Sequence, residues 1–151
     1  MSKIAITDYF SKPSSNEVEI LGDLIGTDIT EETEVLMVWH KDINEKTVGG
    51  IPKLRAVQRY GVGFDNLDLE YLKSRNITCC NNPAYGVDEV SDTAMAYIQA
   101  INRGIFTYDA KARKLSSGWQ EHINNNIKRV NQTKIGVIGA GRIGTSVILK
   151  C

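Results

Sequence analysis

A glycine-rich run has the spacing of a phosphate-binding loop. Its glycines are Gly139, Gly141 and Gly144. They follow the apolar run 134–138 and precede the apolar stretch 145–150. Between a strand and a helix, such glycines permit a tight turn, close approach of an anion to the backbone and packing of the helix on the strand. The helix N-terminus stabilises the negative charge. The pattern indicates binding of a dinucleotide pyrophosphate; the alternative is a glycine turn that binds nothing.

The elements before this loop alternate between strands and helices. Apolar runs without internal alternation are typical of parallel strands that are covered on both faces. Helical spacing separates these runs, so we predict a doubly wound parallel α/β sheet. The expected strands are 4–6, 35–39, 54–57 and 77–80, and the expected helices are 17–25, 43–48 and 67–73.

The pattern changes after Asn82-Pro83. From Val87 onward, apolar residues recur every three or four positions, which predicts a long amphipathic helix over 87–115. Gly104 interrupts it at a cost of about 1 kcal/mol relative to Ala. Such a helix is long enough to bridge two domains or to pack against a second subunit. The alternative is a bent pair of core helices.

The remaining sequence predicts a polar loop and the start of a second domain. Residues 116–133 are rich in Ser and Asn, with Trp119 as the expected surface anchor; the alternative is a binding role for Trp119. Strand 134–138, the glycine loop and a short helix fill 134–151. We therefore divide the chain into a domain at 1–86 and the beginning of another at 87–151.

Composition argues against several classes of partner. The chain has 18 basic and 18 acidic residues, which gives no global field for nucleic acid or an anionic membrane. No apolar run reaches the roughly 20 residues of a membrane span, and no secretory leader is recognisable. The three cysteines lack metal-site spacing. Cys79 and Cys80 read as strand residues in a reducing compartment. We expect a cytoplasmic protein without a metal site.

Four motifs in a fixed order produce a family resemblance. They are Arg59-Tyr60-Gly61-Val62-Gly63-Phe64-Asp65-Asn66-Leu67-Asp68, Asn82-Pro83, Val87-Asp88-Glu89-Val90-Ser91-Asp92, and Gly139 to Gly144. Together they resemble the D-isomer-specific 2-hydroxyacid dehydrogenases over nearly the whole chain. The resemblance implies a flavodoxin-like substrate domain, followed by a helix that leads into a Rossmann nucleotide-binding domain and helps form a dimer.

The resemblance also implies roles for the first motif. Val62 and Gly63 would bind the carboxylate of a small 2-hydroxy or 2-oxo acid through backbone amides, with Tyr60 and Gly61 shaping the loop. A nest of amides holds an anion without adding a titratable group. Arg59 matches a basic residue that some members place near substrate; the alternative is an Arg paired with an acid.

Other polar residues near this motif have less specific expectations. His40 borders the active site in some relatives, although a structural or solvated role is favoured here. Asp65 and Asn66 are expected to shape the turn and cap the following helix.

The cofactor expectations follow the family in the same way. Val90 would meet the nicotinamide, while the backbone around Gly139, Gly141, Arg142, Ile143 and Gly144 would hold the pyrophosphate. The expected cofactor is NAD. NADP stays open, because the acidic residue that grips the ribose would lie about 20 positions downstream.

The family's catalytic Arg, Glu and His would lie beyond Cys151, so no catalytic residue is assigned. The leading hypothesis is a truncated NAD-dependent dehydrogenase, inactive alone, with hydride transfer as its chemistry. The alternative is a non-catalytic module that dimerises through 87–115 with itself or with a full-length relative. A third reading is a remnant whose strand 134–138 has no sheet to join.

Overall fold

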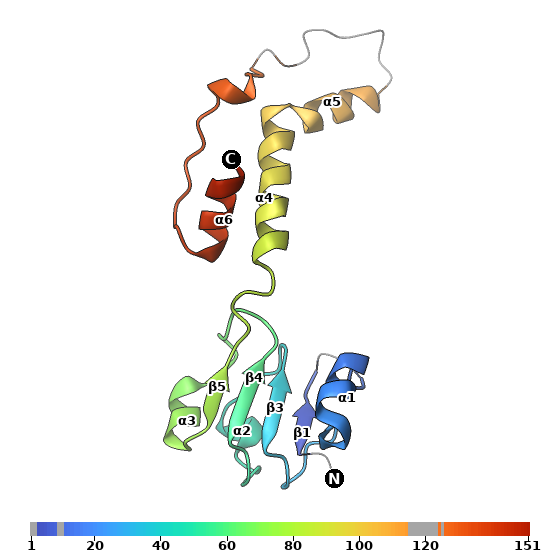
Figure 1. Ribbon diagram of the computed structural model, residues 1–151, viewed down its shortest axis with the longest axis vertical. Helices are drawn as coiled ribbons and strands as arrows, with labels where there is room; N and C mark the ends of the chain where they lie inside the picture. The colour runs from blue at the N-terminus through green and yellow to red at the C-terminus, as the bar shows by residue number, and fades with distance from the viewer. Residues whose placement is uncertain (1–2, 9–10, 115–123, 125) are drawn as a thin grey trace. The chain divides into compact units, whose positions relative to one another are not determined.

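A computed structural model describes residues 3–8, 11–114, 124 and 126–151. The chain divides into two compact units, 1–85 and 86–151 (Figure 1). Trp119 and most of the expected loop up to residue 125 lie outside the described residues. No described helix combines the length and apolar character needed to cross a membrane.

The first unit contains a parallel sheet with the strand order β2-β1-β3-β4-β5 (Figure 1). Every pairing of neighbouring strands is parallel. The predicted parallel α/β architecture is therefore confirmed. The strands are β1 (Ile4–Ile6), β2 (Ile25–Gly26), β3 (Val35–Val38), β4 (Ala56–Arg59) and β5 (Thr78–Cys80).

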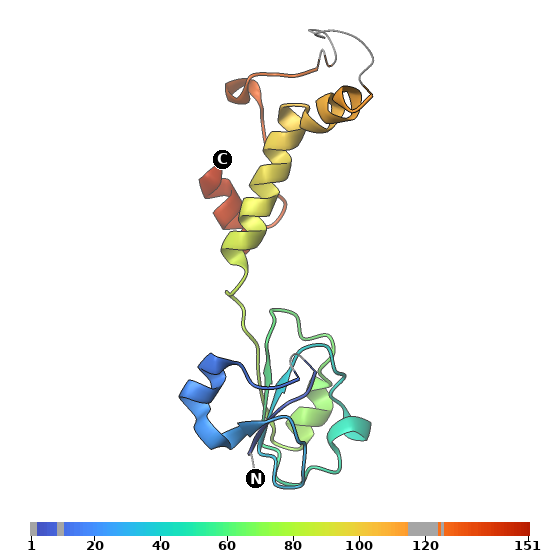
Figure 2. The same ribbon diagram turned by 90° about the vertical axis from the view of Figure 1, so that its right-hand side faces the viewer.

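Helices cover both faces of this sheet. Helix α1 (Ser15–Leu21) lies on one face, while α2 (Glu45–Val48) and α3 (Leu69–Ser74) lie on the other (Figure 2). Side chains cap all three N-termini and satisfy amides that the helix leaves unpaired. The caps are Ser14, Asn44 and Asp68.

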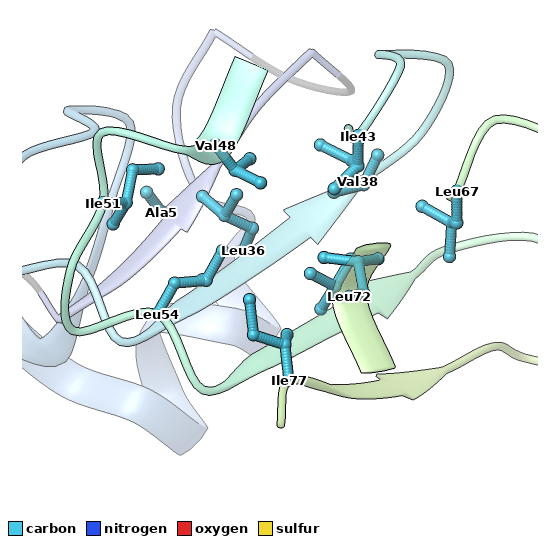
Figure 3. Packing of buried hydrophobic residues seen from close by; sticks show 11 residues of the cluster. Ala5, Leu36, Val38, Ile43, Val48, Ile51, Leu54, Leu67, Leu72 and Ile77 are labelled. Carbon is cyan, nitrogen blue, oxygen red and sulfur yellow. The ribbon is translucent and has the colours of Figure 1, made fainter. Parts of the chain in front are cut away.

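The apolar core lies between the sheet and the α2–α3 layer (Figure 3). Leu72 of α3 and Val38 of β3 are completely buried. Along β3, fully buried residues alternate with partly buried ones, so the two faces of the sheet are covered to different degrees. The cluster comprises Ala5, Leu36, Val38, Ile43, Val48, Ile51, Leu54, Val57, Leu67, Leu72 and Ile77.

Element boundaries in this unit differ from the sequence expectations. The helix expected over 17–25 ends at Leu21, and Ile25 belongs to the unpredicted strand β2. Gly22 has φ +56°, which a continuing right-handed helix cannot accommodate. Strand β4 begins at Ala56 rather than Leu54. The expected helix cap at Asp65 or Asn66 is wrong, because Asp68 caps α3 by accepting a hydrogen bond from the Tyr71 amide (3.0 Å).

In the second unit, the helix expected over 87–115 is two helices. Helix α4 covers Val87–Asn102 and α5 covers Ile105–Ala112. Gly104 separates them with φ +65°, a left-handed conformation that glycine adopts without steric cost. The amphipathic spacing continues across this break, so periodicity alone missed it. The paired-helix alternative describes this region better.

Helix α6 (Arg142–Lys150) packs along α4 within this unit (Figures 1 and 2). The Ser91 and Ser146 hydroxyls are 2.9 Å apart. Lys150 Nζ donates to Ser91 Oγ (2.7 Å) and forms an ion pair with Asp92 (2.6 Å). Charge-assisted and neutral hydrogen bonds therefore join the two helices.

The strand expected at 134–138 is not formed in the described structure. These residues pair with none of the strands of the described sheet, and Ile138 is fully exposed. A parallel strand needs neighbours on which to bury both faces. Just before them, a short 3₁₀ helix, Val130–Gln132, falls within the expected loop.

Candidate functional site

The loop after β4 is held at the carboxyl edge of the parallel sheet. The Tyr60 amide donates to the Val38 carbonyl (2.9 Å), which continues the β3–β4 pairing beyond the strands. Gly61 accepts a hydrogen bond from the Asn82 amide (3.1 Å), and the Val62 carbonyl accepts one from Asn81 Nδ2 (2.7 Å). The carboxyl edge is where open α/β sheets bind ligands.

Tyr60 ties this loop to the start of α1. Its hydroxyl donates to Glu17 Oε1 (2.6 Å), while Glu17 Oε2 accepts from the Ser14 amide (2.7 Å). Partial burial of Glu17 opposes its ionisation, but the hydrogen bonds from Tyr60 and Ser14 outweigh that effect and lower its pKa. The charged form of Glu17 therefore anchors both the helix and the loop.

Arg59 lies directly over the first glycine of the loop. A Cβ atom on Gly61 would be 1.6 Å from Arg59 Nη1 and 3.0 Å from Trp39 Cζ3. A side chain at this position would displace the Arg59 guanidinium. Gly61 is itself buried, so its place in the motif has a packing reason.

The Arg59 guanidinium also stacks on Trp39. Its central carbon lies 4.6 Å from the indole centroid, within the range of a cation–π interaction. Arg59 Nε is buried and has no hydrogen-bond partner. Among the described residues, no acidic side chain forms an ion pair with Arg59. The expected alternative of an Arg paired with an acid is not found there.

The segment carrying Trp39 is held from two sides. The Asp8 carboxylate accepts from the backbone amides of Trp39 (2.9 Å), His40 (2.6 Å) and Lys41 (2.8 Å). Asn66 Nδ2 donates to the carbonyls of Lys41 (2.8 Å) and Trp39 (3.4 Å). Desolvation opposes ionisation of Asp8, but the hydrogen bonds from Thr7 and the three amides lower its pKa.

His40 is exposed, and its ring meets the Trp39 ring edge-on, 4.7 Å between centroids. The favoured structural or solvated interpretation of His40 suits this position.

Sequence reasoning missed Asp8 and the contact of Trp39 with Arg59. An acidic residue after the first strand is a weak signal, because its amide partners lie more than 30 positions later. Only the order of the strands in the sheet could have indicated this contact. In the observed sheet β1 and β3 are neighbours, so residues that follow them meet at one edge.

The glycine loop of the second unit leaves room for an anion beside the N-terminus of α6, although no strand precedes it. Gly139 has φ +93°, and a Cβ on Gly144 would lie 2.0 Å from the Gly139 carbonyl oxygen. A Cβ on Gly141 would meet no atom within 4 Å, so the backbone is open to an approaching anion there. Gly141 caps the nine-residue helix α6, whose first residues are Arg142 and Ile143. These residues fit a phosphate group.

Val90 lies in the first turn of α4, where its amide donates to the Gly86 carbonyl (3.1 Å). Its side chain is half exposed, which leaves it accessible.

Residues 5–138 match the model of the D-isomer-specific 2-hydroxyacid dehydrogenase catalytic domain. This chain belongs to that family. It is 30% identical over 145 residues to glyoxylate/hydroxypyruvate reductase B of Yersinia enterocolitica, which covers 94% of this chain and 42% of the relative. It is 31% identical over 110 residues to glyoxylate reductase of Thermococcus litoralis, covering 70% of this chain and 33% of the relative.

Solved structures of the family share the fold. D-lactate dehydrogenase from Aquifex aeolicus, complexed with NAD and lactic acid, matches with a TM-score of 0.79 at 24% identity. That match covers 97% of this chain and 47% of the other. The chain thus spans less than half the length of these family members.

Proposed function

We propose that this chain supplies the acid-binding loop and the pyrophosphate loop of an NAD-dependent oxidoreductase, which transfers hydride between the cofactor and a small 2-hydroxy or 2-oxo acid. The observation that carries the proposal is the Arg59 guanidinium placed against the first glycine of the GxG loop. Relatives named as glyoxylate and hydroxypyruvate reductases support an acid of this class.

Within this proposal, Arg59 and the amides of Val62 and Gly63 bind the substrate carboxylate. A guanidinium and a set of backbone amides provide several donors without a group that titrates near neutral pH. Tyr60 and Gly61 set the course of the loop through their contacts with Glu17 and Arg59. These 151 residues bind and orient the substrate, and proton transfer is assigned to none of them.

The carboxylate site can be tested by NMR with the 151-residue protein and oxamate, a non-reducible 2-oxo acid analogue. We expect saturable shifts of the Gly61, Val62 and Gly63 amides. Arg59→Gln should weaken binding about tenfold, the equivalent of one charge-assisted hydrogen bond. The matched control is Arg55→Gln, which removes the same charge from an exposed side chain paired with Glu34. Shifts confined to other regions, or equal losses in both variants, would contradict the proposal.

For the cofactor, Gly139, Gly141, Arg142, Ile143 and Gly144 would hold the pyrophosphate, and Val90 would lie beside the nicotinamide. NAD is favoured from the family and NADP stays possible. When bound, the cofactor supplies the hydride. The solved D-lactate dehydrogenase contains NAD, and an acyclic imino acid reductase with a similar fold is in complex with NADPH.

Titration of the protein with NADH, followed by amide NMR, tests this site. We expect the largest shifts at Gly141, Arg142 and Ile143. Gly141→Val should abolish them because its side chain would fill the open approach, whereas Gly136→Val, at another unobstructed glycine, should not. Persistence of the shifts in Gly141→Val would refute the assignment. A parallel NADPH titration establishes the preference.

The proposal includes self-association through α4 and α5 in a cytoplasmic setting. Tyr97, Ile101, Ile105 and Phe106 are all more than half exposed on these helices. An alternative partner for the same helices is a longer relative, in which case the chain acts as a non-catalytic module. Sedimentation equilibrium should give a dimer that Ile101→Asp dissociates. A wild-type monomer that copurifies with a co-expressed relative would favour the alternative.

A further inference from the structure

Arg59 is oriented by packing rather than by an ion pair. Its Nη1 atom lies over Gly61, and its buried Nε has no hydrogen-bond partner. No carboxylate of the described residues pairs with it. The aromatic face of Trp39, 4.6 Å from the guanidinium carbon, is therefore the contact that defines the plane of the group.

Hydrogen bonds hold the backbone of Trp39 in place. Its amide donates to Asp8, and its carbonyl accepts from Asn66. The neighbouring residues His40 and Lys41 are held by the same two side chains. These hydrogen bonds fix the backbone from which the Trp39 side chain extends.

We infer that Trp39 is a positioning residue, which holds the Arg59 guanidinium flat against the GxG loop so that its in-plane N–H groups are presented to the two oxygens of a substrate carboxylate. The inference rests on the proposed function. Stacking covers one face of the guanidinium and leaves the donors in its plane, and planar donors suit a carboxylate. A free Arg side chain would lose much rotamer freedom on binding, whereas a stacked one has lost it beforehand.

The first test observes Arg59 without any ligand. In wild-type protein, the Arg59 Nε–H resonance should show a ring-current shift and slow exchange with solvent. Trp39→Leu should abolish both signatures, and Trp39→Phe should retain them in part because an aromatic face remains. Tyr97→Leu, which removes an exposed aromatic ring from the other unit, is the matched control. An unchanged Arg59 resonance in Trp39→Leu would overturn the inference even if that variant were less stable.

The second test measures the dissociation constant of oxamate. Trp39→Leu should weaken binding about tenfold, as Arg59→Gln does, while Trp39→Phe should weaken it only about threefold. The double variant should bind no more weakly than Arg59→Gln, because the tryptophan acts through the arginine. Additive losses would mean that Trp39 acts independently of Arg59, which contradicts the positioning role.

The outcomes separate this inference from the proposed function. If wild-type protein does not bind oxamate, the proposed carboxylate site fails, and the Arg59 resonance still shows whether Trp39 orients the side chain. If oxamate binds and depends on Arg59 but not on Trp39, the proposed function stands and the positioning role is refuted. Thermal unfolding of each variant identifies losses that come from misfolding.

Discussion

Gly61 shows how the absence of a side chain shapes the loop after β4. The space that a Cβ would fill is occupied by Arg59 and Trp39. The motif therefore depends on this glycine for packing. Gly63, two residues later, has its nearest such contact at 3.5 Å, from Asp65 Oδ2, which is an ordinary van der Waals separation.

This difference predicts unequal effects for two similar substitutions. Gly61→Ala should displace Arg59 and lower the free energy of unfolding by about 1–3 kcal/mol, the usual cost of overpacking. Gly63→Ala should change it by less than about 0.5 kcal/mol. Urea unfolding measures both. Equal effects would show that Arg59 moves aside without cost.

The hydrogen bonds that the Asp8 carboxylate accepts from the amides of residues 39–41 predict that the stability of the fold depends on pH. Because the folded pKa of Asp8 lies below its ordinary value of 3.8, its stabilisation is present above that value and is lost as pH falls through the folded pKa. Asp8→Asn should cost about 1 kcal/mol at pH 6, a modest figure because the carboxylate is exposed.

The difference between Asp8→Asn and wild type should shrink as pH is lowered below 3.8. Urea titrations at several pH values measure it, with the exposed Asp28→Asn as control. A difference that stays constant down to the lowest pH would contradict the role of the charged carboxylate. Glu17 adds a second contribution of the same sign, because its pKa is also lowered.

At the scale of single residues, the sequence motifs identified the residues of the loop after β4 but not the residues that hold this loop in place. Arg59 and Gly61 lie in a contiguous pattern that can be recognised in one stretch. Asp8 and Trp39 act across strands, and their partners are set by which strands become neighbours. Such contacts depend on tertiary structure, so local spacing contains no direct signal for them.

Among the elements, the break between α4 and α5 combines a backbone requirement with close packing. Gly104 has a positive φ, and a Cβ there would lie 2.9 Å from Asn124 Nδ2 and 3.1 Å from Ile127 Cδ1. Amphipathic periodicity does not reveal such a turn, because the apolar residues keep the same three- or four-residue spacing before and after Gly104. The continuous helix was therefore a reasonable but incorrect prediction.

Gly104→Ala should destabilise the second unit by about 1–2 kcal/mol, because alanine pays a steric cost in the left-handed region. Hydrogen exchange of the α4 and α5 amides measures the local effect. Gly86→Ala, where φ is −115° and no atom lies within 4 Å of the added Cβ, should have little effect. A stabilised variant with greater helicity would show that the two helices readily merge.

Strand prediction succeeded where an apolar run had strand partners, and it failed for a very short strand and for a run without partners. Strand β3 was recognised from its apolar run. Strand β2 has two residues, too few for any periodic pattern. Residues 134–138 have the composition of a strand. They have no partners in the described sheet, so they do not form one in this structure.

For the whole molecule, the apolar core belongs to the first unit. All eleven residues of the cluster lie between Ala5 and Ile77. We expect Leu72→Ala to reduce the stability of that unit by about 2–5 kcal/mol, as for other fully buried leucines. Amide resonances of the second unit should keep their own urea midpoint.

The comparison variant is Leu149→Ala, at a leucine that is 81% exposed in the second unit. It should leave the first unit unchanged. Urea titrations followed by NMR report both units in one experiment. A single shared midpoint that moves with Leu72→Ala would show that the units unfold together, contrary to this expectation.

The strand order also bears on how the protein is made. Strand β3 joins the free edge of β1, and β4 and β5 then each join the strand that precedes them in the sequence. The sheet can therefore grow outward in the order in which a ribosome releases the chain. Its last strand ends at Cys80, well before the glycine loop at 139–144. The loop after β4 can thus assume its shape while residues 139–144 are still being synthesised.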